Sequence, residues 1–289
     1  MLGKTRIAPT PSGYLHQGNL FSFTLTWLMA RKAGLQILLR IDDMDRARYR
    51  SQYVEDIFRS LEALGIDYDE GPQSINDFEK NWSQEKRLPL YNSALKQLQE
   101  ANQLFACTCS RKDILAHSPA NIYPGTCLHK KLNLEGEQRA WRWKNHLETI
   151  HIRAWEQKDY QQKLPPEMHY PVLKSKAGYP AYQLSSVIDD LHFGISYIVR
   201  GEDLRNSSLL QLAIAENAFF SDFKSIRFHH HPLKMLAGEK LSKSQGAPAA
   251  LLYRDQNAKQ ALIDDLSQYL HLPKGANNLR ELLDLYRVA

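Results

Sequence analysis

The sequence predicts an α/β protein with a doubly wound parallel sheet, an insertion and a short helical C-terminal region. Its opening elements carry this prediction. A short strand at 5–8 runs into a loop rich in proline and glycine, and apolar residues then recur at helical spacing over 19–33. A compact apolar run at 36–41 suits a buried parallel strand. Strand, glycine loop, helix and strand in this order open a doubly wound, Rossmann-type fold.

The later elements continue the alternation of helices and strands. Helical patterns are expected at 52–64, where Gly65 supplies a stop, and at 85–100. Further on we expect a helix at 182–190, a strand at 195–200, a helix at 207–218 and a strand at 226–230. The segment 105–171 has cysteines, prolines and no long helical period, which indicates an insertion. The expected domains are therefore 1–104, 105–171, 172–249 and a short helical region at 250–289.

Composition bounds the class of protein. Of the 289 residues, 43% are hydrophobic and 24% are charged, which is the ordinary globular range. The net charge of +5 permits a polyanionic partner without requiring one. Three cysteines, an odd number, favour a reducing compartment over a disulfide framework. With neither a secretory signal nor an apolar run long enough to span a membrane, we expect a cytoplasmic protein. We also expect a monomer, although nothing in the residues fixes the oligomeric state.

The first chemical motif is the string Arg-Ile-Ala-Pro-Thr-Pro-Ser-Gly-Tyr-Leu-His-Gln-Gly-Asn at 6–19. Its prolines and glycines fix a loop whose backbone can approach a ligand closely, and the loop leads into a helix N-terminus, where amide groups favour phosphate. His16 is placed to bind phosphate oxygens, and Gly18 lets an adenine ring stack on bare backbone. For Leu-His-x-Gly alone, a turn with a surface histidine is the simpler interpretation.

The second motif is Lys-Leu-Ser-Lys-Ser at 240–244. Two lysines on a loop can neutralise the charge that builds on a triphosphate as pyrophosphate leaves. Alone, such a loop is usually a solvated surface. Its pairing with the first motif, in this order along the chain, favours a site that binds ATP and transfers its adenylyl group.

Together, these motifs resemble the "HIGH" and "KMSKS" signatures of class I aminoacyl-tRNA synthetases. The first string, Arg-Ile-Asp-Asp-Met-Asp at 40–45, and the segment from Tyr182 through Asp189-Asp190 to Arg200-Gly-Glu-Asp203 resemble the glutamyl branch. This likeness runs from about residue 5 to 249. Only 45 residues follow Ser244, so we expect no anticodon-binding domain. In length and in its cysteine-bearing insertion the chain is similar to the glutamyl-queuosine tRNA(Asp) synthetases, which are stand-alone catalytic paralogues.

The resemblance implies a glutamate pocket and an ATP site. Arg6 and Arg200 can hold a carboxylate in a bidentate fork, and Tyr182 adds a hydroxyl donor. Asp42 would accept from the substrate ammonium. The family usually has glutamate there, which is one methylene longer, so either a water fills the gap or the neighbouring Asp43 and Asp45 rearrange. The implied glutamate-binding residues are Arg6, Ile7, Ala8, Pro9, Thr10, Asp42, Tyr182 and Arg200. The implied ATP-binding residues are Pro9, His16, Gly18, Asn19, Lys240, Ser242 and Lys243, of which His16, Lys240 and Lys243 are catalytic, with Mg²⁺ accompanying ATP.

All three cysteines lie in Cys-Thr-Cys at 107–109 and Tyr-x-x-x-Cys at 123–127. From spacing alone, a zinc site and a set of buried reduced thiols are equally good interpretations. The resemblance favours one structural zinc ion, held by Cys107, Cys109, Tyr123 and Cys127, with His117 and His129 as rival fourth ligands. Three further histidines at 229–231 cannot all converge on one ion from a strand, because neighbouring side chains point to opposite faces.

The resemblance implies a two-step ligase. Glutamate is activated by ATP as glutamyl-adenylate, and the glutamate is then transferred to queuosine in the anticodon of tRNA(Asp). Three alternatives stay open from the residues: a truncated glutamyl-tRNA synthetase that charges tRNA(Glu), a nucleotidylyltransferase with a different second substrate, and a non-catalytic RNA-binding relative.

Overall fold

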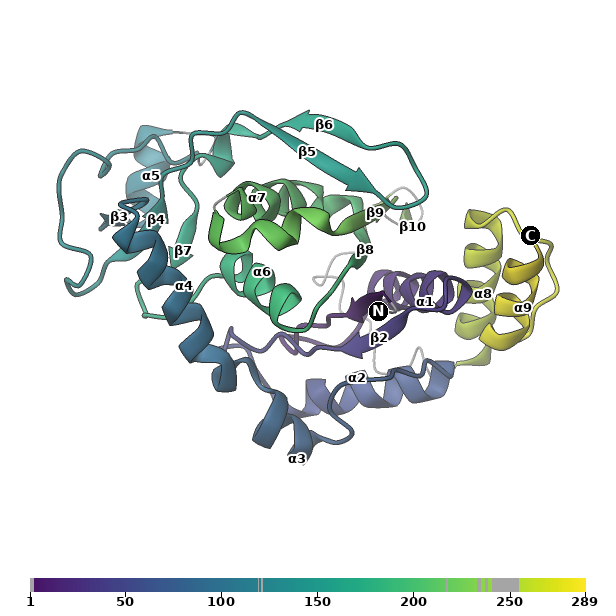
Figure 1. Cartoon of the computed structure of the whole chain (residues 1–289). Helices are drawn as coiled ribbons and strands as arrows, with labels where there is room; N and C mark the ends of the chain where they lie inside the picture. The colour runs from purple at the N-terminus through teal and green to yellow at the C-terminus, as the bar shows by residue number, and fades with distance from the viewer. Residues whose placement is uncertain are drawn as a thin grey trace. The chain divides into compact units, whose positions relative to one another are not determined.

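A computed structural model describes residues 3–118, 120, 122–216, 218–232, 235–236, 239–240 and 255–289 (Figure 1). The chain divides into two compact units. The first contains Met1–Lys86, Ile195–Asp203 and Phe228–Ala289, and the second contains Arg87–Gly194 and Leu204–Arg227. In the described residues, no helix is long and apolar enough to cross a membrane.

The first unit is organised on parallel strands. Strand β1 (Lys4–Ile7) pairs in parallel with β2 (Gln36–Leu39), which places Arg6 opposite Leu38. The backbone N–H of Ser196, just before β8 (Tyr197–Gly201), donates to the carbonyl of Lys4 at 2.8 Å. Strand β9 (Arg227–His231), most of which belongs to this unit, is hydrogen-bonded to β8. The predicted order of strand, loop, helix and parallel strand is confirmed.

Helix α1 (Gln17–Lys32) joins β1 to β2 and is buried over most of its length, including every residue from Phe23 to Ala30. It packs against β1, β2 and β8, and also against two C-terminal helices, α8 (Gln256–Tyr269) and α9 (Leu279–Val288). Because neighbours cover several of its faces, α1 is apolar nearly all round instead of amphipathic. Gly34 follows with a positive φ of 66° and turns the chain into β2.

Helix α2 (Ser51–Leu64) is amphipathic and ends as the sequence predicts. Gly65 is its left-handed C-cap, with φ of 71°, and the N–H of Gly65 donates to carbonyls of the last turn. The short α3 (Ile75–Asp77) leads into a π-helical turn at Phe78–Trp82 and a 3-10 turn at Gln84–Arg87. In the same unit, β10 (Met235–Leu236) and β11 (Glu239–Lys240) form a small antiparallel pair.

The second unit combines helices with antiparallel strands. Strands β3 (Leu104–Cys107), β4 (Ala140–Trp143) and β7 (Val172–Lys174) form a three-stranded sheet, and β5 (Thr149–Ala154) pairs antiparallel with β6 (Tyr160–Lys163). Its helices are α4 (Leu88–Glu100), α5 (Arg111–His117), α6 (Tyr182–His192) and α7 (Arg205–Ala215), with 3-10 turns at Pro166–Met168 and Ala218–Ser225. The domain boundaries at 104, 171 and 249 stay a prediction.

A buried polar network joins α4 to α6. The guanidinium of Arg87 donates from Nε to Oδ1 of Asp189 at 2.7 Å and from Nη2 to Oδ2 at 3.2 Å. The hydroxyl of Tyr91 donates to the same Oδ1 at 2.6 Å, and all three side chains are buried. Burial and the nearby Asp189 carboxylate raise the pKa of the Tyr91 phenol, so it remains a donor. The network holds α6 in place through charge as well as packing.

Replacing Asp189 should therefore destabilise the second unit strongly. We expect Asp189→Leu to lower the free energy of unfolding by about 3–5 kcal/mol, because Arg87 would stay buried without its carboxylate. Urea titration followed by circular dichroism measures the change. The exposed pair Lys96–Glu100 on α4 provides the control, since Lys96→Ala should cost about 0.5 kcal/mol or less. Equal effects of the two variants would contradict this account.

Candidate functional site

The loop between β1 and α1 ends in a histidine that caps the helix. His16 is the N-cap of α1: its Nδ1 accepts from the backbone N–H of Asn19 at 3.3 Å, and Oδ1 of Asn19 accepts from the backbone N–H of His16 at 3.1 Å. This reciprocal pair is a capping box in which histidine and asparagine take the usual places of serine and glutamate. The two residues predicted to contact ATP therefore also fix each other's position at the helix N-terminus.

Gly18 lies directly against the imidazole of His16. A Cβ atom added at Gly18 would lie 3.1 Å from Cε1 and 3.2 Å from Nδ1 of that ring. Such contacts are tighter than ordinary van der Waals separation, so a larger residue would displace His16. Glycine is thus needed here for the side chain of His16, in addition to the open backbone that the sequence suggests for an adenine ring.

Asp42, after the end of β2, is held by a residue that the sequence analysis did not single out. The Arg40 guanidinium donates from Nε to Oδ1 of Asp42 at 2.7 Å and from Nη2 to Oδ2 at 3.0 Å. Both side chains are buried, with Arg40 2% and Asp42 7% exposed. The two residues lie two positions apart on extended chain, where side chains share a face, and this spacing is the signal that could have identified the pair.

Asp43 and Gln84 anchor the same segment to the 3-10 turn that precedes α4. Oδ1 of Asp43 accepts from the backbone N–H of Gln84, and Oδ2 accepts from the hydroxyl of Ser83, both at 2.7 Å. In return, the side-chain carbonyl of Gln84 accepts from the N–H of Met44 at 2.8 Å. Arg46 adds a salt bridge to Asp43. Asp43 is therefore committed to the scaffold and does not compensate for the short side chain of Asp42.

The other predicted glutamate contacts are distributed over several elements. Arg6 on β1 and Arg200 on β8 are both buried, and Arg200 lies 5.7 Å from the ring centre of Phe228. Ile7 and Pro9 are buried, Ala8 is half-buried and Thr10 is exposed. Tyr182 begins α6 in the second unit, with 41% of its surface exposed.

The lysine motif is described only in part. Lys240 ends β11, in the antiparallel pair with β10. Ser242 and Lys243, to which the sequence analysis assigns contacts with ATP, lie outside the described residues.

The three consecutive histidines of β9 take separate partners. His229 hydrogen-bonds the hydroxyl of Tyr269 at 2.9 Å, and His231 packs against Phe21. His230 instead stacks on Phe228, with ring planes 3° apart. Alternation along the strand separates His230 from its two neighbours, as the sequence predicts.

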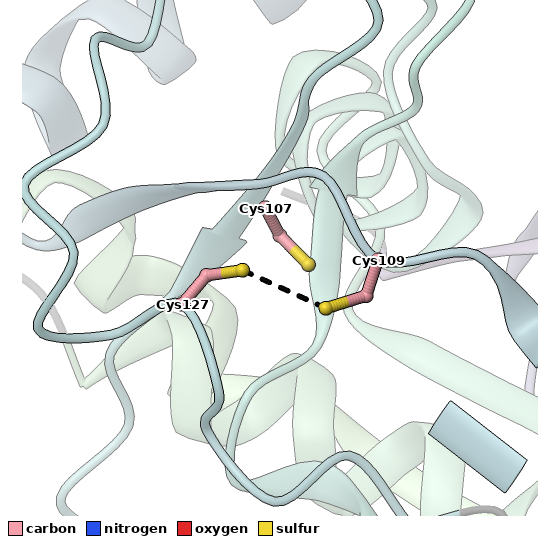
Figure 2. Close-up of side chains that lie close together, drawn as sticks. All are labelled: Cys107, Cys109 and Cys127. Atoms are coloured by element: carbon pink, nitrogen blue, oxygen red, sulfur yellow. Dashed lines mark hydrogen bonds between the residues drawn. The ribbon is translucent and has the colours of Figure 1, made fainter. Parts of the chain in front are cut away.

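The cysteines converge in the second unit. Cys107 ends β3, Cys109 precedes α5 and Cys127 follows in a loop, and Figure 2 shows their sulfur atoms turned toward one another. The three Sγ atoms lie within 4.8 Å of one another, and those of Cys109 and Cys127 are 3.6 Å apart. Tetrahedral zinc with Zn–S bonds of about 2.3 Å separates its sulfur ligands by about 3.8 Å. The donor set and its spacing therefore fit zinc.

Tyr123 lies beside the three thiols. Its hydroxyl oxygen accepts from the backbone N–H of Cys127 at 2.8 Å. The guanidinium of Arg142, on β4, lies 3.8 Å from the centre of the Tyr123 ring and donates to the carbonyl of Tyr170 at 2.6 Å. This buried cation, absent from the sequence analysis, partly offsets the negative charge that thiolate and phenolate ligands would bring.

The thiols differ in their acidity. Burial raises the pKa of Cys109 to about 11, and the thiol of Cys127 contributes to this rise. Burial acts in the same direction on Cys127, but hydrogen bonds from the Thr108 backbone and from Tyr123 lower the pKa of Cys127 to about 6. In the described residues, the group of converging ligand atoms includes neither His117 nor His129, and the Nδ1 atom of His117 is hydrogen-bonded to the carbonyl of Asp113.

Comparison with known proteins places these features in a family. The family described as "tRNA synthetases class I (E and Q), catalytic domain" matches residues 4–282. A Glutamyl-Q tRNA(Asp) synthetase of Synechococcus sp. (strain CC9605) is 36% identical over 96% of this chain and 87% of its own length. A Glutamyl-Q tRNA(Asp) synthetase of Neisseria meningitidis serogroup B (strain MC58) is 33% identical over 96% of this chain and 92% of its own.

Among solved structures, a glutamate-tRNA synthetase from Elizabethkingia anophelis superimposes with a TM-score of 0.77 at 20% identity. The match covers 99% of this chain, and the chain spans 66% of that structure's length. At this identity the likeness shows a shared fold, which confirms the predicted class I synthetase architecture. The family match and the relatives at 33–38% identity show that the chain belongs to the class I tRNA synthetases of the E and Q type, among the glutamyl-Q tRNA(Asp) synthetases.

Proposed function

We propose that this protein activates L-glutamate with ATP and transfers the glutamate to queuosine in the anticodon of tRNA(Asp). One observation carries the proposal. Two relatives named Glutamyl-Q tRNA(Asp) synthetase match 96% of the chain, and the match covers 87% and 92% of their own lengths. A relative named Glutamate--tRNA ligase 1, from Nitrosococcus oceani, is 31% identical, but the match covers only 54% of its length.

The first step is a displacement at phosphorus. An oxygen of the glutamate α-carboxylate attacks the α-phosphorus of ATP, the bond to the bridging oxygen breaks, and pyrophosphate leaves. In this proposal His16 and the amide groups at the N-terminus of α1 bind phosphate oxygens, and the position of His16 as the N-cap of that helix supports this role. Lys240 and Lys243 would neutralise charge on the leaving pyrophosphate, and Mg²⁺ bound with ATP would supply further charge neutralisation there. Catalysis comes from positioning and electrostatics, with no protein nucleophile.

The second step consumes the glutamyl-adenylate, the mixed anhydride formed in the first step. A hydroxyl of the queuosine cyclopentene-diol attacks the glutamyl carbonyl carbon, and the bond from that carbon to the phosphate oxygen breaks. AMP leaves with the electron pair of this bond, and the hydroxyl proton passes to the departing phosphate or to solvent.

Glutamate is selected in the first step. Its side-chain carboxylate is bound by Arg6, Arg200 and Tyr182, and its main-chain groups are bound by Thr10 and Asp42. The pocket is lined by Ile7, Ala8 and Pro9. The ATP site is completed by Pro9, Gly18, Asn19 and Ser242.

We further propose one structural zinc ion, bound by Cys107, Cys109, Tyr123 and Cys127. The convergence of the three sulfur atoms and the adjacent phenol oxygen support this ligand set. With all four positions taken by protein, the ion would stabilise the loops that carry the cysteines without taking part in the reaction. The cytoplasmic location and the monomeric state stay predictions from the sequence.

The acceptor is tested by incubating the protein with labelled glutamate, ATP and either queuosine-containing or queuosine-free tRNA(Asp). We expect label only on the queuosine-containing tRNA, including its isolated anticodon stem-loop, because the acceptor hydroxyl lies on the modified base. Transfer should survive removal of the 3′-terminal adenosine. Labelling of tRNA(Glu) that needs an intact 3′ end and ignores queuosine would instead support the truncated-synthetase alternative.

The glutamate pocket is tested with Arg200→Lys. We expect the KM for glutamate to rise about tenfold or more while the KM for ATP changes little, because a lysine point charge cannot reproduce a bidentate fork. Pyrophosphate exchange, measured against each substrate, gives both values. Arg227→Lys on β9 is the matched control, since Arg227 binds the carbonyl of Ala154 at 3.1 Å. An equal rise in KM for glutamate and for ATP would contradict the assignment of Arg200 to the glutamate pocket.

The zinc site is tested by elemental analysis of untagged protein prepared with a reductant. We expect one zinc ion per chain in the wild type and in His117→Ala, and little in Cys127→Ser, because three of the four ligands are the chain's three cysteines. Chelation should expose all three thiols to titration and speed proteolysis near them, while ATP binding persists. Zinc-free wild-type protein with full glutamate activation would refute the proposal.

A further inference from the structure

A buried carboxylate on α2 holds the backbone of the loop between β1 and α1. Oδ2 of Asp56 accepts a hydrogen bond from the N–H of Leu15 at 2.9 Å, across 41 positions of the sequence. Asp56 is 4% exposed and Leu15 is equally buried. Leu15 directly precedes His16, the N-cap of α1, so the contact fixes the backbone at the residue next to the predicted phosphate-binding imidazole.

A second contact joins the same two segments. The ring of Tyr14 packs edge-on against Tyr53, one turn before Asp56 on α2, with centroids 5.0 Å apart and planes at 83°. Two consecutive loop residues, Tyr14 and Leu15, therefore contact the same face of one helix. Aromatic contact limits sliding of the loop along α2, and the hydrogen bond sets the orientation of the peptide at Leu15.

Packing alone does not account for a carboxylate at this position. The other buried positions of α2 include Val54, Ile57 and Leu61, which supply the apolar contacts. Burial raises the pKa of Asp56, and the Leu15 amide and the nearby Arg59 offset only part of that rise. Desolvation of the carboxylate is thus a cost that an apolar side chain would avoid, and the Leu15 hydrogen bond offsets part of it.

We propose that Asp56 is a positioning residue for adenylate formation, acting through Leu15 on His16. The inference rests on the proposed function, in which His16 binds phosphate. Asp56 touches no substrate. By holding the Leu15 peptide, it sets the direction in which the chain enters α1 and thereby the place of the imidazole relative to the triphosphate.

The test compares Asp56→Leu, which keeps the branched shape of the side chain and removes the acceptor, with Asp56→Asn, which keeps a carbonyl acceptor. Pyrophosphate exchange gives kcat and the KM for glutamate, and thermal unfolding gives Tm. We expect Asp56→Leu to lower kcat by at least tenfold and by up to about a hundredfold, since misplacement by about 1 Å can cost about a hundredfold in rate. The KM for glutamate should stay within about twofold of wild type. Asp56→Asn should recover most of kcat.

Ile57→Ala is the matched control, because Ile57 is the next residue of α2 and is buried without a polar role. It should lower Tm at least as much as Asp56→Leu and leave kcat near wild type well below Tm. Wild-type kcat in Asp56→Leu, no recovery in Asp56→Asn, or a loss of kcat that tracks Tm across all three variants would overturn the proposal.

Hydrogen exchange separates this inference from the proposed function. Peptides covering 10–16 should exchange faster in Asp56→Leu than in Ile57→Ala or wild type, whatever reaction the protein performs. If Asp56→Leu does not fold, Asp56→Ala is measured in the same way. Unchanged exchange in 10–16 would overturn the anchoring role, whereas wild-type protein without glutamate-dependent pyrophosphate exchange would overturn the proposed function.

Discussion

The first unit depends on the burial of α1. The helix packs against β1, β2 and β8 and also against α8 and α9, so its axis is set by the apolar core. Its N-terminus is then fixed as well, and the loop from β1 has to meet it at a defined point. The capping box of His16 and Asn19 closes that junction. The loop that is predicted to bind ATP is thus attached to a part of the fold that cannot shift without repacking the core.

Three buried aspartates set the course of the loops around this core. Asp42 is paired with Arg40, Asp43 receives the Ser83 hydroxyl and the Gln84 amide, and Asp56 receives the Leu15 amide. Each carboxylate loses its hydrogen bonds to water on burial and replaces them with directed hydrogen bonds to protein groups. Burial of each carboxylate is therefore favourable only in one local geometry. Carboxylates of this kind contribute more to fixing the conformation of a loop than to the free energy of unfolding.

The sequence predicted the elements that follow from local periodicity. The apolar run of β2, the amphipathic α2 and its Gly65 stop were readable because each depends on near neighbours. The periodicity predicts a helix from residue 85, whereas α4 begins at Leu88, because the preceding residues form a 3-10 turn in which Arg87 binds Asp189. Asp56 and Arg142 could not be identified, since their partners Leu15 and Tyr123 are brought close by the fold alone. The first motif places His16 and Asn19 close together in the sequence, but it does not reveal that they form the capping box of α1.

The pairing of Asp42 with Arg40 bears on how glutamate would be recognised. Both carboxylate oxygens face one guanidinium, which fixes the plane of the carboxylate and leaves it little freedom to rotate toward a ligand. Asp43 is tied to the scaffold and offers no substitute. A carboxylate that is one methylene shorter than the family's usual glutamate, and is also fixed in orientation, would bind the substrate ammonium in one of two ways. Either the amino acid lies closer to the end of β2, or a water molecule bridges the gap, and a bridging water costs little binding free energy.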